Sequence, residues 1–142
     1  MIKKQNLRDV EFRPAANRKI AELISKDVLG AQNVTFRIVE IVPLSEQEER
    51  HPHSHQDFEE AIFVLSGRGK VWVEGDSVDV EEGDALLIPA GVVHMLMNAT
   101  EDPLRLACFF PVPDGVANRT RAKAPIHPGS ILDDESQGSE RT

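Results

Sequence analysis

The chain has 142 residues, with 24 acidic and 16 basic side chains and a formal net charge of −8. This length fits a single domain, and the negative charge repels nucleic-acid phosphates and anionic lipid, so neither is an expected partner. Cys108 is the single cysteine, which excludes an intramolecular disulfide. No apolar run approaches the ~20 residues of a membrane span or resembles an export signal, so we expect a soluble cytoplasmic protein.

Residues 1–33 are expected to form an N-terminal extension whose secondary structure the sequence leaves open. Four apolar residues within Pro14–Gly30 follow helical spacing, and Gly30 can serve as a C-cap. These four are Ile20, Leu23, Ile24 and Val28. The part from Lys19 to Ser25 is equally compatible with a first edge strand, so both a short helix and a strand remain possible here.

Residues 34–113 break into short runs rich in Val, Ile, Leu and Phe, separated by Gly, Pro or acidic turns. This spacing is typical of an all-β sandwich or barrel. The runs are Val34–Val42, Glu60–Ser66, Gly69–Gly75, Ser77–Glu82, Ala85–Ala90, Val92–Ala99 and Leu104–Val112. A Gly-Asp pair at positions 75 and 76 predicts a hairpin turn between two of them.

The run Glu60–Ser66 is apolar on both of its faces. If Glu60 points inward, so do Ile62 and Val64, but the alternate positions, such as Phe63, are equally apolar. A strand of this kind has to be covered on two sides. A second sheet can cover one side, and the N-terminal segment or another subunit the other; we favour a homodimer.

Residues 114–142 contain few large apolar side chains and many turn formers, which predicts a polar C-terminal tail. Ile131 and Leu132 are the residues of this segment that can dock on the domain. His127 is expected to be solvated.

Three histidines alternate along the stretch "HPHSHQDFEE", at positions 51, 53 and 55. In an extended chain, residues two apart share one face, so these imidazoles can approach a common point. Neutral imidazole is a frequent ligand of divalent transition metals. Glu60 follows closely, and His94 is the one further histidine inside the predicted β region.

Two spaced motifs in this region resemble those of the cupin superfamily. The first is His53-x-His55, then Glu60 and Gly67; the second is Gly83, Pro89-x-Gly91, His94 and Asn98. The chain departs from the family pattern in one place, because the charged stretch "SEQEERHP" stands where a glycine is expected upstream of His53.

The resemblance implies a cupin-type antiparallel β-barrel or jelly roll, with the N-terminal extension and the polar tail outside it. It also implies that His53, His55, Glu60 and His94 bind one divalent transition metal ion, such as Fe, Mn, Ni or Zn. Such a ligand set leaves one or two coordination positions of an octahedral ion for water or substrate, as a catalytic site requires.

The expected function is therefore a metal-dependent enzyme acting on a small oxygen-rich molecule, such as an enol, diol, keto acid or sugar. We place dioxygenase-type oxidation first, because it is frequent among small stand-alone cupins. A non-redox isomerase or lyase and a non-catalytic ligand-binding cupin are the alternatives. Glu60 or a metal-bound hydroxide is the candidate general base.

Other polar residues receive structural interpretations. We expect His51 at the rim of the site and Glu59 in solvent, and we expect Asn98 to fix a loop through hydrogen bonds to backbone. Cys108 is interpreted as a small buried hydrophobe. Three arginines, Arg37, Arg68 and Arg105, are candidate anchors for a substrate carboxylate, but each is expected on the surface.

Overall fold

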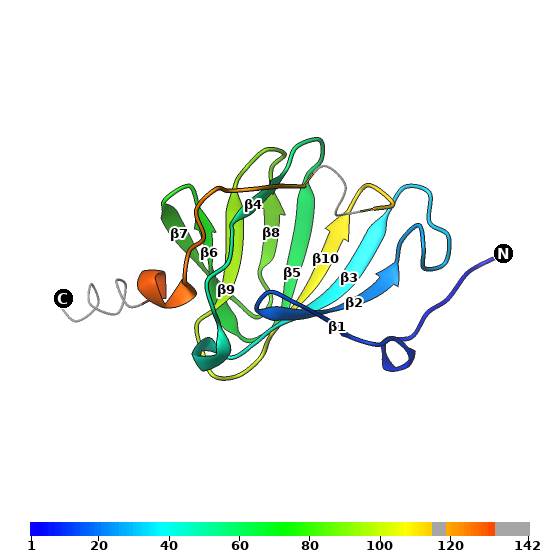
Figure 1. Ribbon diagram of the computed structural model, residues 1–142. Helices are drawn as coiled ribbons and strands as arrows, with labels where there is room; N and C mark the ends of the chain where they lie inside the picture. The colour runs from blue at the N-terminus through cyan, green and yellow to red at the C-terminus, as the bar shows by residue number, and fades with distance from the viewer. Residues whose placement is uncertain (115–118, 133–142) are drawn as a thin grey trace.

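The computed structural model describes residues 1–114 and 119–132, which form two antiparallel sheets (Figure 1). The first sheet has six strands in the order β1 (Arg13–Ala15), β2 (Arg18–Ile24), β3 (Thr35–Ile41), β10 (Leu104–Phe110), β5 (Glu60–Ser66) and β8 (Ala85–Ile88). The second has five in the order β11 (Arg119–Arg121), β4 (His53–His55), β9 (His94–Asn98), β6 (Arg68–Val73) and β7 (Asp76–Glu81). The all-β prediction is confirmed.

Short 3₁₀ segments, η1 (Leu7–Asp9) and η2 (Leu44–Glu46), lie outside the sheets. Within the described part of the chain, no helix is long and apolar enough to cross a membrane.

The seven predicted apolar runs correspond to strands β3 and β5 to β10. The predicted hairpin joins β6 to β7, where Val73 pairs with Asp76 and two residues form the turn. Glu74 and Gly75 both have positive φ, 49° and 89°. This combination matches the tight turn whose twist suits a hairpin, and glycine adopts it without steric cost.

The ambiguous segment near residue 20 forms a strand. β2 pairs with β1 on one side and with β3 on the other, and Ile20 lies opposite Val39 of β3. Because both neighbours are strands, the backbone groups of β2 are satisfied by sheet pairing, and this tertiary pairing overrides the helix-like spacing of its apolar residues.

The hydrophobic core occupies the space between the sheets. Along β5, Glu60, Ile62 and Val64 are buried, whereas Ala61, Phe63 and Leu65 are exposed, so within this chain one face of the strand is covered and the other is not. The buried core cluster consists of Ile20, Val39, Ile41, Ile62, Val64, Val71, Val80, Ile88, Leu104, Leu106 and Cys108. Glu60 therefore shares its face with the apolar core, which takes its carboxylate away from bulk water.

Asn98 fixes the loops at the end of β9. Its side-chain amide donates hydrogen bonds to the backbone oxygens of Ile41, Val42 and Asp102, and its Oδ1 accepts one from the Thr100 amide. The predicted backbone-binding role of Asn98 is confirmed.

Candidate metal centre

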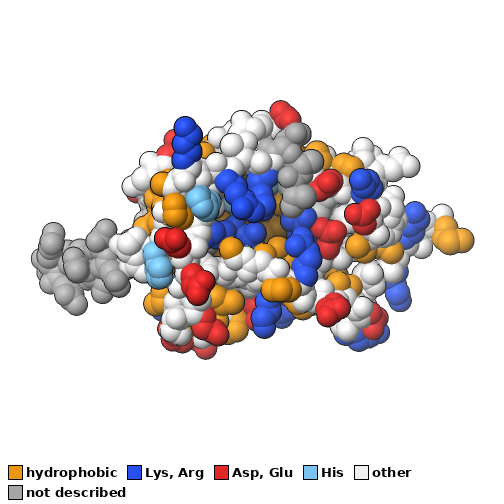
Figure 2. Space-filling model, in the orientation of Figure 1, with side chains coloured by type: hydrophobic (Ala, Val, Ile, Leu, Met, Phe, Trp, Pro, Cys, Tyr) orange, Lys and Arg blue, Asp and Glu red, His pale blue; other side chains and the backbone are white. Residues whose placement is uncertain are grey.

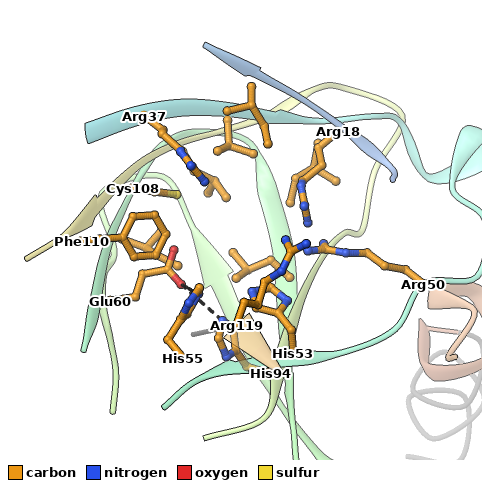
Figure 3. A pocket seen from close by; sticks show the side chains of 16 residues that line it. Arg18, Arg37, Arg50, His53, His55, Glu60, His94, Cys108, Phe110 and Arg119 are labelled. Atoms are coloured by element: carbon orange, nitrogen blue, oxygen red, sulfur yellow. Dashed lines mark ion pairs between the residues drawn. The ribbon is translucent and has the colours of Figure 1, made fainter. Parts of the chain in front are cut away.

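The four predicted ligands come from three strands and meet between the sheets. His53 and His55 lie two residues apart on β4 and therefore share a face, and His53 is the direct partner of His94 on β9. Glu60 begins β5 in the other sheet. One candidate ligand atom from each of His53, His55, Glu60 and His94 lies within 4.8 Å of the others. Figure 3 shows these side chains pointing toward one another.

The Glu60 carboxylate lies between two imidazoles. Its Oε1 is 3.3 Å from His94 Nε2 and 3.6 Å from His55 Nε2. Burial alone would raise the pKa of Glu60, but the contacts with His55 and His94 outweigh it and hold this pKa below its usual value. The carboxylate is thus ionised at neutral pH, which is the form that binds a cation.

A tight turn before β9 orients His94. The Gly91 amide donates to the backbone oxygen of His55 at 2.7 Å, and Gly91 has a φ of 80°, which favours glycine. His94 Nδ1 lies 2.9 Å from the backbone oxygen of Val92. When Nδ1 donates this hydrogen bond, Nε2 carries the free lone pair and points at Glu60, as in many metal-binding histidines.

His55 is held by aromatic rings rather than by hydrogen bonds. Its imidazole stacks on Phe58 at 4.9 Å and meets Phe110 edge-on at 5.0 Å. Both of its ring nitrogens are buried and lack a hydrogen-bond partner among the described residues. A buried polar atom without a partner is costly, and a metal ion at this position would satisfy one of the two nitrogens.

His53 is prepared for the same role by its surroundings. Burial lowers its pKa to about 2, with further contributions from His94 and His55. Its ring is therefore neutral at physiological pH, as coordination requires. Three imidazoles and one carboxylate fit a divalent transition metal ion, so the cluster can bind one.

The cluster lies at the wall of a cavity of about 60 Å³. A wider hollow of about 350 Å³ adjoins it, and the two share six lining residues. The shared residues are Arg18, Ile20, Arg37, Arg50, His53 and Arg119. A small molecule can therefore reach the histidines, and both sheets contribute to the walls around it.

The sequence model of the family described as "Cupin domain" matches residues 37–110, which are just over half of the chain. The chain belongs to the cupin family. Strands β4 to β10 and most of β3, and with them all four candidate ligands, lie inside the matched region.

Two curated relatives of this cupin carry the description uncharacterized protein. The one from Aquifex aeolicus is 39% identical over 64 residues, which are 45% of this chain and 53% of the relative. The one from Methanocaldococcus jannaschii is 32% identical over 56 residues, which are 39% of this chain and 45% of the relative. The cupin thus spans about half the length of the curated relatives it matches.

Solved structures share the fold at low sequence identity. An oxalate decarboxylase from Lactobacillus farciminis has a TM-score of 0.64 and 24% identity, with 89% of this chain and 36% of that chain covered. The polyketide cyclase RemF from Streptomyces resistomycificus has a TM-score of 0.66 and 22% identity, with 89% and 85% covered. A double-stranded β-helix protein from Klebsiella pneumoniae has a TM-score of 0.66 and 18% identity, with 87% and 100% covered.

The other residues singled out from the sequence of this cupin lie outside the metal cluster, some on the surface and some in the cavity wall. His51 lies outside the cluster, where its Nδ1 contacts the backbone oxygen of Ala122 at 2.8 Å, and His127 is exposed. Burial raises the pKa of the Cys108 thiol well above its ordinary value, so Cys108 is a protonated wall residue. Arg68 is exposed, as expected. The surface prediction for Arg37 is wrong, because its side chain is buried and lines the cavity.

Sequence reasoning missed three further arginines of the cavity, Arg18, Arg50 and Arg119. Arg50 belongs to the charged stretch that replaces the family's leading glycine, and this departure was the one available signal for it. Arg119 lies in β11, within the range expected to be a polar tail, and β11 pairs with β4. The sequence of this strand, Arg-Thr-Arg, has no apolar pattern that would predict a strand, and the strand is recognised by its backbone pairing with β4.

Proposed function

We propose that this cupin is a metal-dependent enzyme that oxidises a small oxygen-rich molecule in a dioxygenase-type reaction. The observation that carries the proposal is the cluster of three imidazoles and one carboxylate at the wall of a cavity. A bound metal ion would polarise substrate oxygens and, if redox-active, supply electron transfer toward O₂. The oxalate decarboxylase and the polyketide cyclase of the same fold support an enzymatic role without specifying the reaction.

The residues around the cluster provide a dry site. Beyond the four candidate ligands, the cavity wall combines apolar side chains with arginines and the Cys108 thiol. The apolar members are Ile20, Val39, Ile41, Ile62, Leu96, Leu106 and Phe110. Excluding water strengthens electrostatic interactions with the substrate and protects reactive species from hydrolysis.

The composition of this wall favours oxidation over an isomerase or lyase reaction. An isomerase or lyase has to move protons with a positioned acid or base, yet among the described cavity-lining residues the one carboxylate is Glu60. The chain contains no tyrosine, and the Cys108 thiol stays protonated. Proton abstraction would therefore fall to Glu60, which is also a candidate metal ligand, or to a metal-bound hydroxide, whereas electron transfer at the metal needs no carboxylate beyond the ligand itself.

The test begins with the metal content of protein purified without chelator. We expect roughly one first-row transition metal ion per chain, since the four donors form one site. Oxygen uptake is then followed with enols, diols, keto acids and sugars, in air and under nitrogen. Turnover in air alone supports the dioxygenase, and equal turnover under nitrogen identifies an isomerase or lyase. A chain that binds metal and ligands but turns over none of these classes is a binding protein.

A further inference from the structure

Positive charge is concentrated at the cavity of a protein that is acidic as a whole. Of the ten arginines in the sequence, six are seen among the described residues that line the cavity or the adjoining hollow, together with two carboxylates, Glu49 and Glu60. Figure 2 shows Lys and Arg side chains gathered around a hollow on this face. We call the four that line both spaces, Arg18, Arg37, Arg50 and Arg119, the arginine cradle. Arg13 and Arg121 line the outer hollow only.

The cradle is built from both sheets. Arg18 lies on β2 and Arg37 on β3, in the six-stranded sheet, whereas Arg119 lies on β11 in the other sheet. In the register of β11 and β4, Arg119 is the direct partner of His55. The basic strand therefore runs beside the strand that carries two of the candidate metal ligands. Figure 3 shows the cradle side chains converging near the histidines.

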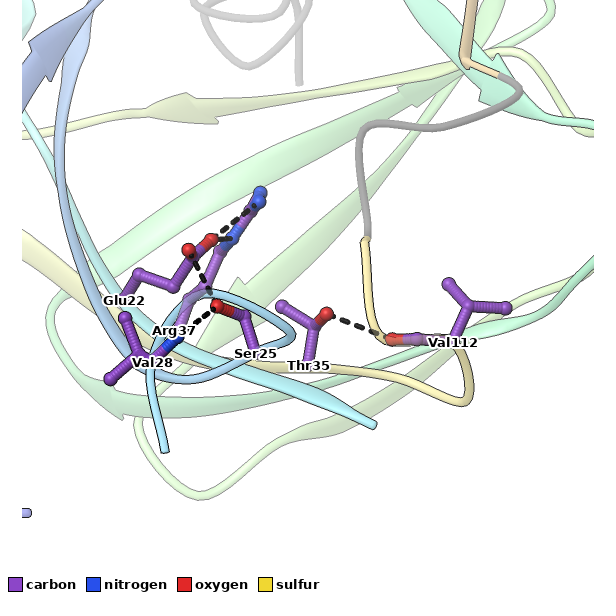
Figure 4. A network of polar contacts seen from close by, with 6 residues as sticks. All are labelled: Glu22, Ser25, Val28, Thr35, Arg37 and Val112. Atoms are coloured by element: carbon purple, nitrogen blue, oxygen red, sulfur yellow. Dashed lines mark hydrogen bonds and ion pairs between the residues drawn. The ribbon is translucent and has the colours of Figure 1, made fainter. Parts of the chain in front are cut away.

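One member of the cradle has an internal partner. Glu22 Oε1 accepts hydrogen bonds from Arg37 Nε at 3.1 Å and Nη2 at 2.9 Å, and Glu22 Oε2 accepts one from Ser25 Oγ (Figure 4). The Arg37 guanidinium also lies 5.4 Å from the centre of the Phe110 ring. These contacts fix Arg37 in position at the cavity wall.

The other three members lack such partners. Within the described chain, no carboxylate pairs with the guanidinium groups of Arg18, Arg50 or Arg119. Burial, and after it the positive charge of Arg119, lowers the pKa of Arg18 to about 10. Holding like charges together in a partly dry space destabilises the ligand-free protein. An arrangement of this kind is stabilised when an anion supplies the missing countercharge.

We propose that the arginine cradle binds the second anionic group of a small organic acid whose first anionic group is placed at the metal centre. The metal end of this assignment rests on the proposed function. Guanidinium groups bind carboxylates and phosphates through paired hydrogen bonds, so either group has the right chemistry. The enclosed space of the hollow suits a small molecule, and its positive wall would attract a dianion toward an otherwise acidic protein.

The charge requirement is tested with three ligands of equal size: succinate, its half-amide succinamate, and the neutral succinamide. Affinity for the metal-containing protein is measured by calorimetry, together with the shift in melting temperature. We expect succinate to bind at least about tenfold more tightly than succinamate, since the half-amide cannot make the second charge-assisted contact with the cradle. A parallel titration with 2-phosphoglycolate tells whether the second group is preferred as phosphate or carboxylate. Equal affinity for all three succinyl compounds would overturn the proposal.

The location is tested with Arg18→Met and Arg119→Met, with Arg68→Met as the matched control. Arg68 is exposed and lines a separate hollow on β6. We expect both cradle variants to lose at least about tenfold in succinate affinity and the control to lose none. Arg18→Met should also raise the melting temperature of the ligand-free protein, because it removes an unpaired cation; a purely structural arginine would give the opposite change. An equal loss of affinity in Arg68→Met would contradict the cradle as the binding site.

The two proposals can fail separately. If the protein takes up no metal but binds succinate in an Arg18-dependent way, the metal-enzyme proposal is wrong and the cradle stands. If it takes up metal and oxidises neutral diols with no preference for dianions, the cradle is wrong and the metal-enzyme proposal stands.

Discussion

His53 on β4 and His94 on β9 face each other as direct partners in the sheet, with ring centroids 4.6 Å apart. Cross-strand partners of this kind hold two side chains at a fixed separation without any loop between them. Glu60 completes the arrangement from the opposite sheet, so a displacement of either sheet would separate the donors. The candidate metal centre therefore connects the two sheets, and metal binding should stabilise the whole fold as well as the site.

Removal of His94 should abolish metal binding. We expect His94→Ala to lose more than about 100-fold in metal affinity, since changes to residues around a metal ligand already cost about 10–100-fold. Metal content after gel filtration provides the measurement, and the melting temperature with and without added metal gives a second one. His127→Ala is the control, because His127 is exposed and lies outside the cluster. Full metal content in His94→Ala would exclude His94 as a ligand.

The stability of the metal-free protein should depend on pH through His53. The pKa of this imidazole is 6.5 in its ordinary state and about 2 in the folded chain. Between these values the unfolded chain binds the extra proton, so stability falls as the pH drops below 6.5 and levels off above it. The slope contributed by one such group approaches about 1.4 kcal/mol per pH unit.

This dependence is measured by denaturant unfolding of metal-free protein at pH 5, 6 and 7. His53→Leu lacks the titrating group and should show a smaller loss of stability between pH 7 and pH 5. Identical slopes for the wild type and the variant would mean that His53 is accessible to protons in the folded state.

The strands and the four candidate ligands were predictable because both leave local signals. Each of the strands β3 and β5 to β10 is an apolar run bounded by turn residues, and the spacing of His53, His55, Glu60 and His94 matches a known pair of motifs. Gly91 could be placed in a turn for the same local reason, since its positive φ is costly for other residues.

The arginine cradle was not predictable, because its members are oriented by tertiary packing. β3 is apolar on both faces, so its alternation does not tell whether the face with Arg37 and Val39 or the face with Phe36 and Ile38 points inward. β11 is a three-residue polar strand that exists through its pairing with β4. The inward direction of Arg37 depends on Glu22, a partner on a strand that periodicity left undecided.

The ion pair of Glu22 with Arg37 should matter more for stability than a similar pair in the same sheet. The side chains of Arg37 and Glu22 are 9% and 24% exposed, and two guanidinium nitrogens of Arg37 donate to Glu22 Oε1. Those of Arg105 and Glu40 are 38% and 31% exposed, and their nearest charged atoms are 3.6 Å apart. Breaking a largely buried pair leaves an uncompensated charge, and exposed pairs contribute little.

We therefore expect Glu22→Ala to lower the free energy of unfolding by about 2 kcal/mol or more. The matched variant Glu40→Ala, which breaks the exposed pair, should change it by about 0.5 kcal/mol or less. Denaturant unfolding at neutral pH measures both. A larger effect for Glu40→Ala would show that Glu22 does not hold Arg37 in the way the structure indicates.

The outer face of the six-stranded sheet carries an apolar patch that the N-terminal segment leaves exposed. Phe63 is 45% exposed, Leu65 38%, Leu87 63% and Phe109 37%. They are close together, because Ala61 on β5 pairs with both Leu87 and Phe109, and Phe63 lies two residues further along β5. We propose that a second copy of the chain covers this patch. An exposed apolar patch can bury itself against its own image about a two-fold axis.

Phe63→Asp should convert the resulting dimer to a monomer, because burying an unpaired carboxylate costs several kcal/mol while the folded monomer keeps this position in solvent. Light scattering after gel filtration at micromolar concentration measures the mass. Val78→Asp is the control, since Val78 is 55% exposed on β7 of the other sheet and its substitution should leave the dimer intact. A wild-type protein that stays monomeric at this concentration would mean that the patch is covered by something other than a second copy.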